Sequence, residues 1–432
     1  MSAVYTSERF VGIDFGTTNS AIAVAETDGS VRVSTFDSGG VLTEVLRSVL
    51  FFEADPDARS GVIVTAGLAA IEASLAGNEG RLLQSIKSFL PSPSMDKTAI
   101  FGRVFSYEEL VARFLKELRR QAEVTLGPLG RRAVVGRPVV FVKDGEDGRE
   151  ELALTRLRTA YAAAGFTEVD FQYEPVAAAL EFARGRDDVS TVLVGDFGGG
   201  TSDFCVMRLG GHRREVISTS GVPVAGDTFD GRIVRAVVAP ELGLGSYYQS
   251  FDKRLEVPSA LYWNVERWQH LAFMRDRETL HVLRKIEASA EHPERLRTFI
   301  RLIQNNLGFA LYRAVDRTKV ALSVGSEAAL DFVDDDVSIR RTVKRADFER
   351  WIGDDLLRIG AGIDDALSRA GLTEAQIDEV VLTGGSSFVP AVREVFTRRF
   401  GTERLRRAAE FTSIAHGLAL DARARAVSEA RG

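Results

Sequence analysis

The hydrophobic pattern near the start of the chain predicts two short strands joined by a glycine turn. Apolar residues fill Phe10 to Ile13 and Ala21 to Ala25, and the segment between them, Asp14 to Ser20, is rich in Gly, Thr and Ser. Two apolar runs that flank a short polar turn are typical of a β-hairpin. The same arrangement returns later, where runs at Val192 to Val194 and Phe204 to Met207 flank a second glycine turn.

The two turns resemble each other in residue type as well as in position. The first reads Asp14-Phe15-Gly16-Thr17-Thr18-Asn19-Ser20, and the second, which starts 182 residues later, reads Asp196-Phe197-Gly198-Gly199-Gly200-Thr201-Ser202-Asp203. Solenoid repeats have periods of about 20–50 residues, so an echo at this distance indicates a duplicated domain. We place the boundary in the polar stretch at 185–188, which gives a first lobe of residues 1–186 and a second of 187–432.

The rest of the pattern alternates between helix and strand, which indicates an α/β protein. In the first lobe we expect helices at Tyr107 to Thr125, Thr155 to Ala164 and Pro175 to Ala183, and a strand at Ala133 to Val142. In the second lobe we expect a helical insertion at about 240–311, helices at Gly308 to Ala321, Pro390 to Arg399 and Thr412 to Ala424, and a strand at Glu379 to Leu382.

Composition narrows the class of protein. A chain of 432 residues with 45% hydrophobic and 27% charged residues is an ordinary globular protein, and single cores stop growing near about 250–300 residues, which favours two lobes. The net charge of −6 offers no basic face for nucleic acid. No signal peptide or membrane span is recognisable, so we expect a cytoplasmic protein without a nucleic-acid or membrane partner. One cysteine and five scattered histidines leave only oxygen ligands for a metal.

Glycine turns of this kind suit the binding of phosphate. They present several backbone N–H groups to one small volume without an intervening Cβ, and Thr and Ser hydroxyls add donors. Asp14, Asp196 and Asp203 offer the hard oxygens that Mg²⁺ prefers, usually through its bound waters. Either turn alone reads best as a plain hairpin. Two matched turns in duplicated halves can clamp a polyphosphate from both sides, so together they predict a nucleotide site.

At this point the motifs resemble a known family. Gly12 to Ser20 (GIDFGTTNS) and Gly195 to Asp203 (GDFGGGTSD) are similar to the two phosphate motifs of DnaK-type heat-shock chaperones. Further matching segments follow in the family's order at Gly136 to Phe141, Phe171 to Leu180 and Leu382 to Pro390. Three segments are most similar in sequence to the short YegD-like branch of this family: Phe171 to Leu180, Ile86 to Leu90 and Tyr262 to Asn264. The resemblance implies the actin-like ATPase fold, with two duplicated lobes of mixed sheets flanked by helices and a nucleotide cleft between them.

The resemblance also assigns roles, position by position. It implies phosphate contacts from the two turns, at Gly16, Thr17, Thr18, Asn19, Gly198, Gly199, Gly200 and Thr201. It implies that Asp14, Asp196 and Asp203 hold the water shell of Mg²⁺, that Glu174 lies near the attacking water, with Asp196 and Thr201 also catalytic, and that Pro138 couples nucleotide state to lobe movement. The implied adenosine pocket comprises Gly226, Asp316, Lys319, Ser323, Gly384, Gly385 and Ser386, with Asp316 in place of the family's longer glutamate.

Two of these assignments have simpler readings from the residues alone. Glu174 precedes Pro175 and could act only as a favourable charge at a helix N-terminus. Gly384-Gly385-Ser386 could be an ordinary turn between a strand and a helix. Only the order of the motifs along the chain favours a functional role for Glu174 and for the Gly384 segment.

The chain departs from the family pattern in two places. The printed sequence ends within about fifty residues of Gly384, without the family's linker and peptide-binding domain, so peptide clamping is unsupported. The region that corresponds to the family's phosphate-contacting lysine, near Ala69 to Ala73, has no lysine in this chain. The first lysine in the chain is Lys87, and it is our candidate for that contact, with Arg81 the weaker one. The alternative for Lys87 is a surface lysine that extends from a half-buried segment.

The leading hypothesis is an ATPase that converts ATP to ADP and phosphate, in which Mg-ATP draws the lobes together. Its expected ligands are ATP or ADP and Mg²⁺, and its expected protein partners are an unidentified client and a nucleotide-exchange factor. Three alternatives stay open from the sequence: a nucleotide-gated binding module with little turnover, an actin-like filament subunit, and a small-molecule kinase on the same fold.

Overall fold

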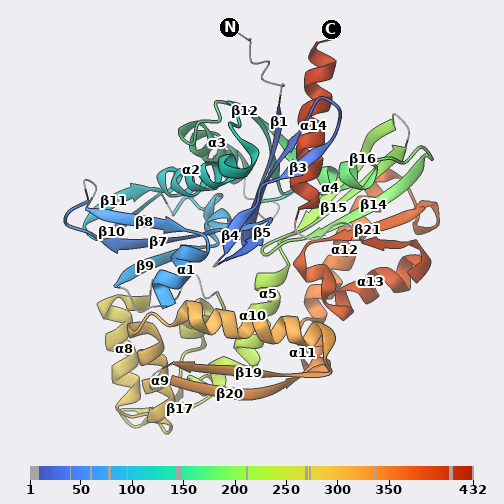
Figure 1. Ribbon diagram of the computed structural model, residues 1–432. Coiled ribbons are helices and arrows are strands. Elements are labelled where there is room, and N and C mark those ends of the chain that lie inside the picture. Colours follow the sequence, from blue (N-terminus) through green and yellow to red (C-terminus); the bar gives the residue numbers. More distant parts are fainter. Residues whose placement is uncertain are drawn as a thin grey trace. The chain divides into compact units, whose positions relative to one another are not determined.

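A computed structural model describes the chain in two compact units (Figure 1). The first unit comprises Met1–Ala225, Arg358–Ser387 and Arg393–Gly432, and the second comprises Gly226–Leu357 and Phe388–Val392. The residues that the structure describes are 9–38, 40–58, 61–75, 79–94, 96–141, 148–210, 213–267, 271, 274–334, 337–407 and 412–430. Both glycine turns fall in the first unit.

The first sheet has the strand order β13-β12-β1-β2-β3, with β6 (Leu46–Arg47) also paired to β2. The strands are β1 (Phe10–Phe15), β2 (Asn19–Ala25), β3 (Val31–Val33), β12 (Arg132–Arg137) and β13 (Glu168–Tyr173). The predicted hairpin is confirmed, because β1 and β2 are antiparallel and Asp14 pairs with Ala21. The strand expected to reach Val142 ends at Arg137 instead, since the following Pro138 has no N–H for a sheet bond.

The second sheet repeats this plan, in the order β16-β15-β14-β21-β22. Its strands are β14 (Ser190–Phe197), β15 (Ser202–Gly210), β16 (Arg213–Val222), β21 (Glu379–Thr383) and β22 (Leu405–Arg407). In each sheet a three-stranded antiparallel meander carries the glycine turn at its first hairpin, and two parallel strands extend the sheet beyond the first strand. The repeated motif in the sequence therefore corresponds to a repeated strand topology.

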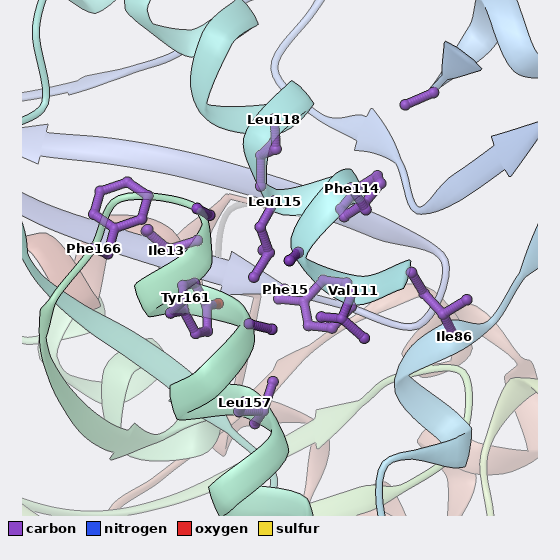
Figure 2. Close-up of a cluster of buried hydrophobic side chains, with 14 of the residues drawn as sticks. Ile13, Phe15, Ile86, Val111, Phe114, Leu115, Leu118, Leu157, Tyr161 and Phe166 are labelled. Atoms are coloured by element: carbon purple, nitrogen blue, oxygen red, sulfur yellow. The ribbon is translucent and has the colours of Figure 1, made fainter. Parts of the chain in front are cut away.

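Helices predicted from the apolar stripes cover the first sheet. They are α2 (Tyr107–Leu126) and α3 (Arg149–Ala163), and α2 begins at a capping box in which Ser106 and Glu109 satisfy each other's backbone N–H groups. Figure 2 shows Ile13 and Phe15 of β1 lying between Val111 and Phe114 of α2 and side chains of α3. This buried core fixes the end of β1, where the first glycine turn begins.

The last helix, α14 (Ser413–Glu429), packs against β1, β2, β12 and α4 (Glu174–Phe182) in the first unit (Figure 1). Two glycines allow the close approach. A Cβ on Gly12 of β1 would overlap the backbone of Ala419, and a Cβ on Gly417 would overlap the backbone carbonyl of Ala177 in α4. The helices predicted at Pro175 to Ala183 and Thr412 to Ala424 are thus confirmed, and small residues bring them into contact.

The remaining elements of the first unit are small sheets and short helices around these layers. They are β4 (Phe36–Ser38), β5 (Val41–Thr43), β7 (Val49–Ala54), β8 (Val62–Ala66), α1 (Leu68–Leu75), β9 (Gly80–Gln84), the 3₁₀ helix η1 (Ile86–Phe89), β10 (Lys97–Ile100), β11 (Arg103–Ser106), η5 (Glu374–Gln376), η6 (Gly385–Phe388) and η7 (Thr402–Arg404). The helices α12 (Gly353–Ala370) and α13 (Pro390–Phe400) contribute residues to both units.

The second unit is mostly helical. It contains α5 (Gly226–Ile233), the π-helical turn η2 (Val234–Val238), α6 (Ala239–Glu241), η3 (Ser259–Tyr262), α7 (Trp263–Glu266), α8 (Arg277–Glu287), α9 (Pro293–Gln304), α10 (Gly308–Val324) and α11 (Arg345–Trp351). Two hairpins, β17 (Tyr247–Ser250) with β18 (Lys253–Glu256) and β19 (Glu327–Asp334) with β20 (Val337–Lys344), complete it. In the part of the chain described, no helix has the length and apolar character needed to cross a bilayer.

Candidate functional site

Four buried carboxylates gather where the two sheets of the first unit present their glycine turns. Asp14 lies near the end of β1, Asp196 near the end of β14, Asp203 near the start of β15, and Glu174 at the first position of α4. Each is at most 8% exposed. Their charges act on one another, since Glu174 raises the pKa of all three aspartates. The structure thus brings these four residues together, and their predicted roles stay predictions.

Burial and mutual repulsion disfavour the ionised forms of the three aspartates and so raise their pKa values. Burial is the main cause that raises the pKa of Asp14 from 3.8 to about 7, and the carboxylate of Glu174 adds to it. Burial and the Glu174 carboxylate likewise raise the pKa of Asp203 to about 7 and that of Asp196 well above its ordinary value. Buried carboxylates in such a position are stabilised by a bound cation.

Lys87 supplies positive charge to this cluster. Its ammonium donates a hydrogen bond to Glu174 Oε1, and both side chains are 9% exposed. Burial works against the charged ammonium, but the nearby carboxylates of Glu174, Asp14 and Asp196 outweigh it and raise the pKa of Lys87. The alternative of a surface lysine is therefore wrong. Arg81, the weaker candidate, donates to the carbonyl of Ala99 at the surface.

Asp203 is held by two donors from different parts of the chain. Its Oδ2 accepts a hydrogen bond from the hydroxyl of Thr201 at 2.7 Å, and its Oδ1 accepts one from the backbone N–H of Val139 at 2.8 Å. Val139 follows Pro138, the residue that the family resemblance connects with lobe movement. A Cβ on Gly221 would lie 2.7 Å from Asp203 Oδ1. Sequence reasoning missed Val139 and Gly221, because it predicted no strand over β16, where Gly221 lies.

The two glycine turns are half-open to solvent at their tips. In the second turn the N–H of Gly198 donates to the carbonyl of Thr201 at 3.1 Å, and a Cβ on Gly200 would meet no heavy atom within 4 Å. In the first turn Thr17, Thr18 and Asn19 are partly exposed, while the carbonyl of Thr18 accepts from the N–H of Ser48 at 2.9 Å. The turns are thus fixed at their bases and leave space at their tips.

The Gly384 motif lies directly behind the second turn. A Cβ on Gly384 would lie 2.3 Å from the backbone carbonyl oxygen of Phe197, and the hydroxyl of Ser386 donates to the carbonyl of Gly198 at 3.3 Å. The segment is a strand-to-helix turn, as the simpler reading expected, because β21 ends at Thr383 and η6 begins at Gly385. The hydrogen bond from Ser386 means that this segment supports the second glycine turn from the side of β21.

The other expected adenosine residues belong to the second unit. There the ammonium of Lys319 lies 2.9 Å from Asp230 Oδ2 and 3.2 Å from Asp316 Oδ1, and the hydroxyl of Ser323 donates to the carbonyl of Lys319 at 3.3 Å. Gly226 begins α5, which also carries Asp230. Asp230 is a partner that sequence reasoning missed, and its pairing with Lys319 orders this face of α10.

The carboxylate cluster fits Mg²⁺ held through water rather than by direct ligands. Within the described ranges, no group of three or more His, Cys, Asp or Glu side chains is close enough to hold a metal ion directly. The crowded charges of Asp14, Asp196 and Asp203 nevertheless favour a cation near them. Mg²⁺ keeps most of its waters when it binds to proteins, so outer-shell carboxylates are suitable partners.

Two sheets of one plan, each with a glycine turn beside a buried aspartate, define the class of this protein. It has the actin-like ATPase fold, an α/β architecture with mixed sheets flanked by helices.

The comparison with protein families then identifies the group within that class. The chain belongs to the Hsp70 family, because the model of that family, described as Hsp70 protein, matches residues 90–241 and 304–428.

Curated relatives are similar over nearly the whole of this chain. The chaperone protein DnaK of Thermus thermophilus is 29% identical over 96% of the chain, and DnaK of Deinococcus radiodurans is 29% identical over 90%. The stromal 70 kDa heat shock-related protein of pea chloroplasts is 27% identical over 92% of the chain. The chain spans 60%, 55% and 50% of the lengths of these three relatives.

Proposed function

We propose that this chain binds Mg-ATP and hydrolyses it to ADP and phosphate, as a chaperone-like ATPase. The observation that carries the proposal is the buried cluster of Asp14, Asp196, Asp203 and Glu174, with Lys87 beside it, at the base of two matched glycine turns. Membership of the Hsp70 family and the names of the curated relatives support an ATP-dependent chaperone role.

Each part of the cluster has a task in phosphoryl transfer, which depends mainly on positioning and electrostatics. The backbone N–H groups and hydroxyls of the two turns would bind the phosphates. Mg²⁺, when bound, would neutralise phosphate charge, and Asp14, Asp196 and Asp203 would hold its waters. Thr201 keeps Asp203 in place through its hydroxyl.

Lys87 and Glu174 would act on the terminal phosphate and on the attacking water. In the structure each neutralises the other. A bound γ-phosphate offers Lys87 a second acceptor, which would free one carboxylate oxygen of Glu174 to accept a hydrogen bond from water. A base that orients water typically contributes about 10²–10⁴-fold to a rate.

The same pair favours a second candidate function, a nucleotide-gated module with little turnover. If the Lys87–Glu174 bond persists when ATP binds, neither group is free for chemistry, and the chain would report nucleotide state through lobe closure alone. In both cases we expect Mg-ATP to draw the lobes together and to protect the chain from protease more than ADP does. We propose a client protein and an exchange factor as partners, because the relatives are chaperones.

The test combines binding and turnover in one preparation. Calorimetric titration with Mg-ATP, Mg-ADP and Mg-GTP, together with phosphate release, should show tight binding of both adenine nucleotides and slow release of phosphate from ATP. Binding of ATP without release of phosphate would favour the nucleotide-gated module. Absence of adenine-nucleotide binding would overturn both candidate functions. Dependence of light scattering on ATP tests the filament alternative.

A further inference from the structure

The segment that carries Lys87 does not hold its own position. Lys87 lies in η1 (Ile86–Phe89), a single 3₁₀ turn of four residues. Such turns have poor hydrogen-bond geometry and little stability of their own. Ser85, just before the turn, has a φ of 50°, in the left-handed region that non-glycine residues avoid. The position of the Lys87 backbone must therefore be fixed by other parts of the first unit.

One fixed point is the apolar side of the turn. Ile86 and Leu90, on either side of the Lys87 segment, are both buried in the core of the first unit. Figure 2 draws Ile86 in the same buried cluster as Val111 of α2 and Phe15 of β1, and η1 is in contact with α2. These contacts hold the segment against the sheet, but apolar packing does not satisfy the carbonyl groups at the end of the turn. Of these, the Phe89 carbonyl accepts a hydrogen bond from the N–H of Ser92 at 3.0 Å.

Arg156 binds those carbonyls. Its guanidinium Nη1, on α3, donates to the backbone carbonyls of Phe89 at 3.3 Å, Leu90 at 3.0 Å and Ser92 at 2.9 Å. A cation at the C-terminal end of a helical turn also interacts favourably with its dipole. Arg156 is 3% exposed, so water does not compete strongly for these bonds.

Arg156 is itself held in place from α2. Its Nε lies 3.2 Å from Glu108 Oε1, and its guanidinium carbon lies 5.1 Å from the centre of the Tyr107 ring. The helix that carries Arg156 leads directly through β13 into Glu174, the partner of Lys87. One stretch of chain thus fixes both the backbone and the ammonium of the lysine.

We propose that Arg156 is the positioning residue for Lys87: it anchors the backbone after η1 and so sets where the Lys87 ammonium lies in the carboxylate cluster. The inference rests on the proposed function only for its effect on turnover. Arg156 forms no hydrogen bond or ion pair with Lys87, so it acts through the backbone. Because a displacement of about 1 Å at a charged catalytic group can cost about 10²-fold in rate, a loosened turn should affect hydrolysis strongly.

The first test does not need ATPase activity. Arg156→Lys keeps the charge but loses the planar group that reaches three carbonyls. Arg119→Lys is the matched control, because Arg119 on α2 also donates to two backbone carbonyls, of Gly130 and Ala164, away from η1. In nucleotide-free protein, acylation of Lys87 by an amine-reactive ester, quantified by mass spectrometry, should be about tenfold faster in Arg156→Lys than in the parent, as expected when a buried group gains frequent local openings.

The second test is a double-mutant cycle on phosphate release. Arg156→Lys should lower kcat about 10- to 100-fold with ADP affinity nearly unchanged. In a Lys87→Ala background the same change should have little further effect, because the group it positions is absent. A merely structural role would lower stability and rate in both backgrounds alike. If Arg156→Lys does not fold, Glu108→Gln should loosen Arg156 and give the same pattern more weakly.

The outcomes separate this proposal from the proposed function. Faster Lys87 acylation in Arg156→Lys, with no phosphate release from any variant, supports the positioning role and overturns the ATPase. Equal acylation in the parent, Arg156→Lys and Arg119→Lys overturns the positioning role. Additive loss of turnover in the cycle also overturns it.

Discussion

Lys87 and Glu174 form a buried ion pair although 87 positions separate them in the sequence. The pair connects the short turn after β9 with the first residue of α4, and it lies beside three further carboxylates whose pKa values burial raises. Removing one member of a buried pair leaves an uncompensated charge, so each member can be tested by substitution.

Substitution of the lysine should separate chemistry from binding. Lys87→Ala should slow ATP hydrolysis about 10²–10³-fold while ADP affinity changes far less, because charge on the γ-phosphate develops mainly in the transition state. It should also destabilise the protein, by about 3–5 kcal/mol, since Glu174 loses its partner. Phosphate release, ADP calorimetry and denaturation measure the three effects, and Lys97→Ala on the exposed β10 strand is the control. If Lys87→Ala hydrolyses ATP at the rate of the parent protein, Lys87 does not supply the positive charge that stabilises the γ-phosphate in the transition state.

Substitution of the glutamate should act mainly on the rate. Glu174→Gln should leave ATP affinity nearly unchanged and slow hydrolysis by about 10²–10⁴-fold, the usual contribution of a positioning base. Single-turnover phosphate release checks this, with Glu168→Gln on the exposed start of β13 as the control. If the rate does not change, Glu174 serves only the start of α4 and the position of Lys87.

Asp14→Asn should weaken the part of ATP binding that depends on Mg²⁺. The change removes one anionic oxygen and keeps the hairpin, and it also relieves a crowded carboxylate cluster, so the nucleotide-free protein should not lose stability. Titrations of ATP with and without Mg²⁺ measure the effect, and Asp57→Asn in an exposed turn serves as the control. An unchanged Mg²⁺ dependence would refute the role of Asp14.

Gly200→Ala offers a test that is specific for the ligand. A Cβ at Gly200 meets no heavy atom within 4 Å, so the melting temperature of the nucleotide-free protein should change little. If the phosphates occupy that space, the added methyl should cost about 1–3 kcal/mol of ATP binding, the usual effect of overpacking. Gly360→Ala, at an equally open position on α12, is the control. If Gly200→Ala binds ATP as tightly as the parent protein does, the phosphates do not occupy the space beside Gly200.

The burial of Asp230 in the second unit predicts a pH effect on stability. Burial is the main cause that raises its pKa from 3.8 to about 7, with help from the charges of Asp316 and Asp227 and against that of Lys319. Between these two values the folded state keeps a proton that the unfolded chain releases. The contribution of Asp230 is therefore fully present below about pH 4 and is lost as the pH rises through about 7.

Denaturation at several pH values between 5 and 8.5 should show this loss, of a few kcal/mol at most, because one pKa unit corresponds to about 1.4 kcal/mol. Asp230→Asn should flatten the slope, whereas Asp331→Asn, at an exposed ion pair with Arg340, should not. A slope that is the same in all three proteins would contradict the assignment to Asp230.

The sequence predicts this fold well where the signal is local. The apolar runs around Asp14 and Asp196 define both hairpins, and the stripe of α2 is continuous, so periodicity suffices. The expected strand end at Val142 was wrong because Pro138, which lacks a backbone N–H, interrupts the apolar run after Arg137. The division into lobes at residue 187 stays a prediction.

The site is predictable only in part, because its decisive contacts are long-range. The motifs located Asp14, Asp196 and Asp203, but the bond from the Val139 N–H to Asp203 joins residues 64 positions apart. Lys87 was a candidate only because lysines are rare early in the chain. Nothing in its neighbours indicates Glu174 as its partner, or Arg156 as the group that binds the carbonyls beyond it.

The close packing of α14 on β1 has a consequence for synthesis of the chain on the ribosome. The backbone of Ala419, which covers Gly12, emerges about 400 residues after Gly12, and this takes about 20–80 s at ordinary elongation rates. During this time β1 and β2 keep uncovered the small apolar residues that α14 later buries. The first glycine turn therefore acquires its final support only after α14 has been synthesised, and until then these apolar residues stay exposed on the nascent chain.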